Sequence, residues 1–273
     1  MRTEQYSNDA YSPHDIALIV ERMGARKAHL KTSTLLILSI LAGAYISIGA
    51  LLFTVVTTDP TFGFGINRLL GGLSFTLGLI LVVIGGAELF TGNNLLVMAW
   101  ASNEIRIRDL FRNWFFSYIG NMAGALATVV FVLWADIASL SDGAVGETAV
   151  RIATDKANLT LLQAFMRGVL CNALVCLAIW LAMGGHSVVD KIVAIAFPIA
   201  AFVALGFEHS IANWFFLPFG MLLQEGKDAV SVFGAGMNLV MVTAGNLVGG
   251  SLQIAIYWLA YLHKEDNHIH ELT

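Results

Sequence analysis

The chain has 273 residues, of which 57% are hydrophobic and only 12% are charged, and its mean hydropathy is +0.74. Such values are unusual for a soluble domain and predict a protein that lies in a lipid bilayer. The small formal net charge of −4 and the absence of a basic stripe exclude a nucleic-acid-binding protein.

The first 31 residues are polar and predict an amphipathic helix on the cytoplasmic face of the membrane. Ser12-Pro-His-Asp15 combines an N-cap residue, a proline at the first helical position and an early acidic residue. The apolar residues that follow share one face, and the charged residues share another. The apolar face consists of Ile16, Ile19, Val20 and Met23, and the charged face of Glu21, Arg22 and Arg26.

Residues 32–263 contain six apolar windows, each long enough to cross about 30 Å of hydrocarbon. The windows are 32–58, 69–103, 113–135, 168–189, 192–224 and 229–263. We therefore predict one six-span transmembrane channel domain, followed by a cytoplasmic tail over residues 264–273. No cleavable signal peptide is indicated, since a long polar segment precedes the first window.

The distribution of basic residues predicts the orientation. In a six-span chain, the termini and the second and fourth loops lie on one side, and this side carries ten Lys and Arg residues against four on the other. Because basic loops stay in the cytoplasm, both termini are expected in the cytoplasm, with the domain in the inner or plasma membrane.

The second and fifth windows, with 35 and 33 residues, are too long for single continuous spans. Both contain the pattern G-x-E-x-x-x-x-N, at Gly86–Asn93 and again 120 residues later at Gly206–Asn213. We predict a break in each span at this motif, where Thr91-Gly-Asn-Asn94 supplies turn residues and Gly206 supplies flexibility. Backbone freed from a helix at membrane depth must be satisfied by protein or line an aqueous cavity, so the breaks mark the route of transport.

The repeat extends to the other spans. Gly120-Asn121 recurs 125 residues later as Gly245-Asn246, and the same offset relates Gly43 to Gly168 and Ser47 to Asn172. The glycine spacing is also typical of close helix packing, and the two interpretations are compatible. The predicted fold is all-α, with two inverted three-helix repeats and broken second and fifth spans.

Several strings resemble the formate–nitrite transporter family of anion channels over about residues 14–262. They are Phe75-Thr-Leu-Gly-Leu79, Glu88-Leu-Phe-Thr91, Gly120-Asn121, Asn172-Ala-Leu-Val-Cys-Leu-Ala178 and Gly206-Phe-Glu-His-Ser-Ile-Ala-Asn213. The resemblance implies an aquaporin-like protomer in a homopentamer, with a pore in each protomer for small monovalent anions of weak acids. It also implies that the N-terminal helix lies at the cytoplasmic mouth, where it either gates the pore or is a static anchor.

The resemblance assigns pore positions residue by residue. It implies that His209 is the pore histidine and Thr91 its partner on the other broken helix. One constriction corresponds to Leu89, Phe90 and Phe202, flanked by Phe75 and Leu79. The other lies around Asn172 and Val175 on the His209 side, and Lys156 is the lysine of the vestibule.

The residue types agree with transport of an anion, which needs hydrogen-bond donors or a proton in an apolar constriction. His209 is the one histidine in the predicted membrane core, although such a residue can equally be a satisfied core side chain. Lys156 either is a solvated loop charge or acts as an isolated cation that attracts anions. Glu88 and Glu208, with Asn93 and Asn213, are expected to be structural, the carboxylates accepting freed backbone N–H groups; proton carriage is the alternative.

Two other classes of protein are less consistent with the sequence. An intramembrane enzyme with a metal or haem would need a second ligand near His209, and Cys171 and Cys176 have no metal spacing, so no metal or cofactor is expected. A water or glycerol channel would carry Asn-Pro-Ala at both breaks, which this chain lacks. Formate is the expected substrate, with nitrite or hydrosulfide as alternatives.

Overall fold

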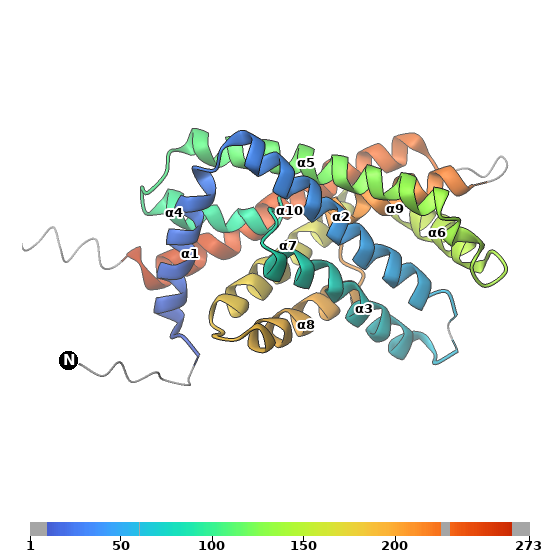
Figure 1. The fold of residues 1–273 in the computed structure, drawn as a ribbon, viewed down its shortest axis with the longest axis horizontal. Coiled ribbons are helices and arrows are strands. Elements are labelled where there is room, and N and C mark those ends of the chain that lie inside the picture. The colour runs from blue at the N-terminus through green and yellow to red at the C-terminus, as the bar shows by residue number, and fades with distance from the viewer. Residues whose placement is uncertain (1–9, 60, 225–229, 264–273) are drawn as a thin grey trace, which may run out of the picture.

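The computed structural model describes residues 10–59, 61–224 and 230–263, and its regular elements are helical (Figure 1). The predicted tail over residues 264–273 and the first nine residues of the N-terminal segment lie outside the described part. The helices are α1 (Pro13–Ala28), α2 (Thr32–Val56), α3 (Phe64–Gly85), η1 (Gly92–Leu95), α4 (Leu96–Ala101), α5 (Ile107–Trp134), η2 (Ile137–Ser139), α6 (Ala144–Ala157), α7 (Leu161–Met183), α8 (Val188–Ala204), α9 (Ser210–Leu223) and α10 (Val232–Tyr261).

The six predicted spans are present, and two are broken as expected. Helices α2, α3, α5, α7 and α10 are each long and apolar enough to cross a membrane. Helices α3 and α4 form the second span, and α8 and α9 form the fifth. Helix α6 was not predicted, because its 14 residues are only moderately apolar and lie in the connection between the third and fourth spans.

The two breaks are equivalent in backbone geometry. Gly86 and Gly206 both have positive φ, at 76° and 74°, which costs glycine little. After each glycine the next N–H bonds five residues back, from Ala87 to Val82 (2.9 Å) and from Phe207 to Phe202 (3.0 Å), which is a Schellman ending. The predicted position of the second break is confirmed.

The first break also lies within the predicted motif, at residues 86–91, but the residues expected to supply its turn mostly follow it. The chain leaves α3 at Gly86, and Gly92-Asn93-Asn94-Leu95 forms the 3₁₀ turn η1, which starts the second half of the span. Consecutive asparagines after a glycine are typical of turns. Here the Asn93 side chain donates hydrogen bonds to Glu88 and Asn113, and the backbone of both asparagines is part of the 3₁₀ helix.

Glycines allow close helix packing within each repeat, as the spacing indicated. Helix α2 packs on α5, and α7 packs on α10. A Cβ atom at Gly124 would overlap the Ile40 carbonyl oxygen, and one at Gly249 would overlap that of Val169. The helix axes therefore approach closely enough for backbone to touch backbone.

The register predicted for the first and fourth spans is wrong by four residues. Asn121 donates to the carbonyl of Ser39, and the equivalent Asn246 donates to that of Gly168. Ser39, and not Gly43, is therefore the counterpart of Gly168. Four residues are about one helical turn, so a glycine pattern alone cannot distinguish the two alignments.

Helices α1 and α6 lie at opposite ends of the bundle (Figure 1). Helix α1 begins as predicted, because the Ser12 hydroxyl accepts the Asp15 N–H at 3.2 Å. Its buried face includes Ile16 and Val20 and contacts α4, α5, α7 and α10. Helix α6 packs mainly on α9 and α10. Each broken span therefore has one short amphipathic helix near its second half.

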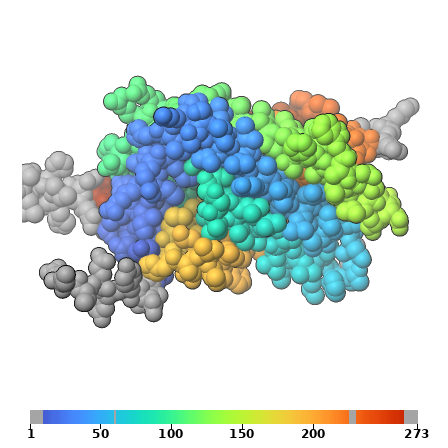
Figure 2. Space-filling model, in the orientation of Figure 1, coloured from blue at the N-terminus to red at the C-terminus, as the bar shows by residue number. Residues whose placement is uncertain are grey.

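Large apolar side chains cover much of the outer surface, including Phe64, Trp134, Phe197 and Phe233, each more than two thirds exposed. Figure 2 shows one face of the molecule, on which α2 (blue), α3 (cyan) and α8 (orange) are visible together. Exposed apolar surface on this scale indicates contact with lipid or with other subunits.

Substitution of one α10 glycine should separate packing from helix propensity. We expect Gly249→Ala to lower the free energy of unfolding by about 1–3 kcal/mol, because the new methyl group would push α10 from α7. Gly236→Ala, in the same helix with open space at its Cβ position, should be neutral or stabilising. Thermal unfolding in detergent measures both; equal midpoints would contradict the close packing.

Candidate functional site: the helix breaks and their two cavities

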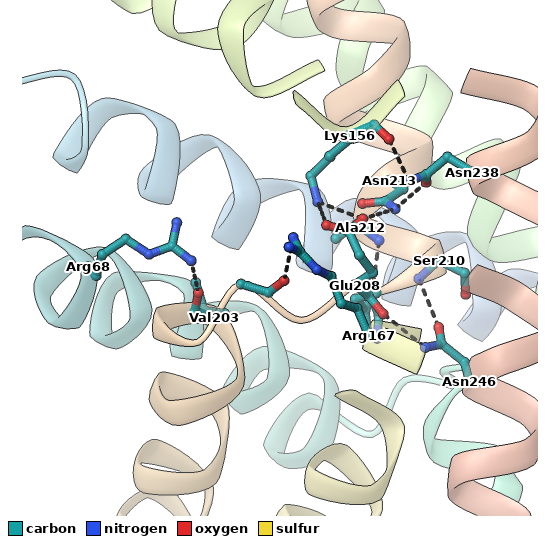
Figure 3. Close-up of polar contacts among 12 residues, drawn as sticks. Arg68, Lys156, Arg167, Val203, Glu208, Ser210, Ala212, Asn213, Asn238 and Asn246 are labelled. Carbon is teal, nitrogen blue, oxygen red and sulfur yellow. Dashed lines mark hydrogen bonds and ion pairs between the residues drawn. The ribbon is translucent and has the colours of Figure 1, made fainter. Parts of the chain in front are cut away.

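Two asparagine side chains form hydrogen bonds with the backbone N–H and C=O groups that the helix breaks leave unpaired. Asn121 accepts the Phe90 N–H at 2.8 Å and donates to the carbonyls of Ser39 (2.7 Å) and Glu88 (2.9 Å). Asn246 on α10 makes the equivalent bonds with Ser210 N–H and the Glu208 carbonyl (Figure 3), and it also donates to the Gly168 carbonyl. Both amides are fully buried, so these bonds replace water that is absent at this depth.

A lysine from α1 joins the first break. Lys27 Nζ lies 3.1 Å from Glu88 Oε1 and donates to Asn93 Oδ1 at 3.1 Å. The Asn93 amide donates to Glu88 (2.9 Å) and to Asn113 Oδ1 (2.8 Å), and Asn113 donates to the Lys27 carbonyl. Four side chains thus form one network that ties α1 to the break.

A lysine from α6 joins the second break in the same way (Figure 3). Lys156 Nζ contacts both carboxylate oxygens of Glu208, at 2.9 and 3.0 Å. Asn213 donates to Glu208 (2.7 Å) and Asn238 (2.8 Å), and Asn238 donates to the Lys156 carbonyl (2.9 Å). Lys156 is therefore paired, and its predicted alternatives as a solvated charge or an isolated cation are both wrong.

The expected partners of the two glutamates differ from those observed. Glu88 and Glu208 accept bonds from lysine and asparagine side chains, whereas the Phe90 and Ser210 N–H groups are taken by Asn121 and Asn246. An amide can accept and donate at once, which lets it join a freed N–H to a freed carbonyl. A carboxylate only accepts, and a buried one needs a cation, which each lysine supplies.

The structure brings His209 and Thr91 together, one from each broken span. Their Nε2 and Oγ1 atoms are 2.9 Å apart, and both residues are buried. The Ala212 N–H donates to Nδ1 at 3.1 Å, so His209 is the side-chain cap of α9. Because Nδ1 accepts, the neutral ring carries its proton on Nε2, which donates to Thr91 Oγ1.

A cavity of about 190 Å³ leads toward His209 from the α6 end, and we name it the α6-side cavity. Its walls combine aromatic rings with charged side chains. They include Arg68, Phe75, Asp155, Lys156, Arg167, Phe202, Glu208 and His209. The Phe75 and Phe202 rings meet edge to face at 5.6 Å, and Phe202 stacks on His209 at 6.1 Å.

A second cavity, of about 500 Å³, lies at the α1 end, and we name it the α1-side cavity. Its walls include Arg26, Lys27, Val82, Glu88, Leu89, Asn93 and Ile179. None of the described residues lines both cavities. His209 lines the α6-side cavity and Thr91 lines neither, whereas Leu89 and Gly92 on either side of Thr91 line the α1-side cavity, so the Thr91–His209 pair lies between the two cavities.

The predicted constriction residues occupy different places. Leu89 borders the α1-side cavity, whereas Phe75 and Phe202 border the α6-side cavity. The Phe90 ring packs edge to face on Tyr118 of α5, and Leu79 is buried one turn after Phe75.

The predicted positions on α7 are buried beside the breaks. Asn172 is fully buried and donates to the Asn246 carbonyl at 2.7 Å. Val175, three residues later, is also buried. Asn172 thus belongs to the network that surrounds the second break, and it lines neither of the two cavities described above.

Sequence reasoning missed Lys27 as a site residue and counted it only toward orientation. A signal was present, because Lys27-Ala28 and Lys156-Ala157 each end an amphipathic segment just before a span. It also missed Arg68 and Arg167, which directly precede the predicted windows 69–103 and 168–189 and reach the second break only in the folded chain.

Comparison with known proteins agrees with this geometry. The sequence profile described as formate/nitrite transporter matches residues 14–260. The chain is 36% identical to formate channel FocA of Escherichia coli (strain K12) over 278 aligned residues, which covers 95% of this chain and 98% of that protein. It is 41% identical to a probable formate transporter of Methanothermobacter thermautotrophicus over 271 residues, which covers 93% and 98%.

A solved structure described as a pentameric formate channel with formate bound superimposes with a TM-score of 0.77. It is 39% identical and covers 85% of this chain and 98% of that one. Family profile, full-length relatives and fold agree. The chain therefore belongs to the formate/nitrite transporter family, and it is a multi-pass membrane channel and not an enzyme.

Proposed function

We propose that this chain conducts formate, the anion of a weak acid, through a pore that passes the Thr91–His209 pair. The observation that carries the proposal is the 2.9 Å contact between Thr91 and His209, which lies between two cavities that share no lining residue among those described. Relatives named formate channels support formate over nitrite and hydrosulfide, which remain the alternatives within the family.

Thr91 and His209 supply the polar contacts that a desolvated anion needs. Thr91 Oγ1 accepts the His209 Nε2–H and retains its own O–H, which can donate to a carboxylate. Protonation of Nδ1 would set two donors against each other, because the Ala212 N–H already points there. The geometry therefore favours a neutral ring that stabilises the anion by hydrogen bonding. In acid, a second proton would bind Nδ1 at the cost of the Ala212 bond, and the ring would then pass its Nε2 proton to formate and release the neutral acid.

The apolar residues around this pair would select small permeants. Phe75 and Phe202 line the α6-side cavity, Leu89 lines the α1-side cavity, and Leu79 and Phe90 are buried, with Asn172 and Val175 next to the second break. Dehydration of an anion there is costly unless donors replace its water. A solute that lacks a small carboxylate-like group gains too little from Thr91 and His209 to offset that cost.

We propose in addition that the protomer assembles as a homopentamer, with α1 on the cytoplasmic side. The assembly is supported by the similar pentameric structure and by the exposed apolar faces. The orientation is supported by the excess of basic residues in the connections on the α1 side.

Transport in proteoliposomes tests the function directly. With formate, nitrite and hydrosulfide offered in turn at two pH values, we expect the largest flux for formate. His209→Ala should remove the pH dependence of that flux, because the group that titrates is lost. A larger flux of nitrite or hydrosulfide would show that this anion, and not formate, is the substrate. No flux of any of the three would exclude the channel function.

A pair of Thr91 variants tests the hydroxyl. We expect Thr91→Val to reduce formate flux about tenfold or more, since a hydrogen bond to a charged group contributes about 1.5–3 kcal/mol. Thr91→Ser keeps the hydroxyl and should retain most of the flux. Initial uptake rates at neutral pH measure both; equal rates for the two variants would show that the hydroxyl does not act on the anion.

Cysteine labelling tests the orientation. The native Cys171 and Cys176 are buried and should not react with a membrane-impermeant maleimide. Glu104→Cys and Leu140→Cys introduce exposed thiols before and after α5, on opposite sides. We expect Leu140→Cys to react in intact cells and Glu104→Cys only after permeabilisation. The reverse pattern would place α1 outside.

A further inference from the structure

The two cavities have different charges in equivalent positions. At the α1-side cavity, Glu88 neutralises Lys27, and the neighbouring Arg26 leaves this cavity one positive charge in excess. At the α6-side cavity, Glu208 neutralises Lys156, and the residue that precedes this lysine is Asp155. The inverted repeat alone would therefore give the α6-side cavity one negative charge in excess, which repels anions.

Two arginines reverse this sign. Arg68 and Arg167 both line the α6-side cavity, so its net charge becomes positive and equals that of the α1-side cavity. Neither has a basic counterpart in the repeat. Leu38 occupies the position equivalent to Arg167, since Glu88 N–H bonds to Leu38 O and Glu208 N–H bonds to Arg167 O. The position 120 residues after Arg68 is Val188.

The two guanidinium groups converge on one place (Figure 3). A Cβ atom at Gly206 would lie 3.1 Å from Arg68 Nη2 and 4.0 Å from Arg167 Nη1. Among the described residues, no carboxylate forms an ion pair with either arginine. Two like charges held this close without a bridging anion repel each other, and a bound anion would relieve that repulsion.

Both arginines keep donors available for a ligand. Arg68 donates Nε–H to the Ala204 carbonyl at 2.9 Å and Nη2–H to that of Val203 at 2.7 Å. Arg167 donates through Nη1 to the Gly206 carbonyl at 3.4 Å. A guanidinium has five N–H donors, and its planar fork matches a carboxylate. The carbonyl bonds fix the two groups in place at the end of α8 and at the break that follows.

We propose that Arg68 and Arg167 form an anion-capture site in the α6-side cavity, which binds one small carboxylate or similar oxyanion before it reaches His209. This inference rests on the proposed function and assigns these residues a step in it. The site offsets Asp155 and raises the local anion concentration at this mouth. It acts on entry and not on passage between Thr91 and His209.

Formate uptake into proteoliposomes over a range of concentrations tests the site. We expect Arg167→Gln to raise the half-saturating formate concentration roughly three- to tenfold and to leave the maximal rate nearly unchanged. The shift should be large at about 0.01 M ionic strength and small at about 1 M, where the Debye length falls from about 30 Å to 3 Å. Arg108→Gln, an exposed charge on α5, should show no shift.

Two further variants separate charge from structure. Asp155→Asn in the Arg167→Gln background should restore most of the affinity, because it removes the charge that the arginines offset. Arg68→Lys keeps the charge but not both carbonyl bonds. Its half-saturating formate concentration should be closer to that of the wild type than the value for Arg68→Gln. A fall in maximal rate alone, with no effect of salt or of Asp155→Asn, would show that the arginines only hold α8. No flux in the wild type would instead reject the proposed function.

Discussion

Interrupted backbone at membrane depth is the constraint on which this structure depends. A helix that stops inside a bilayer exposes N–H and C=O groups that no water can reach. Asn121 and Asn246 resolve this at the two breaks, each accepting one N–H and donating to two carbonyls. Only a side chain that both accepts and donates can do so, which accounts for the use of asparagine in both halves.

The breaks in turn determine where polar groups can reach a pore. Because α3 and α8 stop at Gly86 and Gly206, the chain that follows places Thr91 and His209 side by side between two cavities. The same backbone that begins α9 orients the imidazole, since the Ala212 N–H donates to Nδ1. Position, orientation and tautomer of the histidine thus follow from one helix start.

Each inverted repeat consists of its three predicted spans and one short amphipathic helix in addition. Helices α1 and α6 occupy equivalent places, and each delivers a lysine to a glutamate at the adjacent break. Pairing makes each lysine part of the scaffold, so the sign of each mouth depends on its neighbours. The two mouths have equivalent backbone but different neighbouring charges, so the charge of each mouth can differ from that of the other. This is the basis for assigning Arg68 and Arg167 a role on one side only.

Much of the site could be predicted from the sequence, because its chemistry follows residue identity and spacing. The apolar windows determined the six spans, the repeated G-x-E-x-x-x-x-N pattern located the broken spans, and Gly206 marked its break. Family resemblance added the pairing of His209 with Thr91, which the structure contains at 2.9 Å. Periodicity and composition are properties of short stretches of sequence, so the spans and their breaks can be predicted without knowledge of the tertiary structure.

The tertiary structure alone decided which charges are paired and which helices are in register. Lys156 and Glu208 are 52 residues apart, and Arg68 meets the Val203 carbonyl 135 residues away. No local pattern encodes such contacts, so neither the pairing of Lys156 nor the position of Arg68 at the break can be predicted from the sequence. The equivalence of Ser39 and Gly168 could not be predicted for a similar reason. Alignments of the two spans that differ by four residues, about one helical turn, place the same helix face toward the neighbouring helix. Only the packing of α2 on α5 and of α7 on α10 shows which alignment is correct.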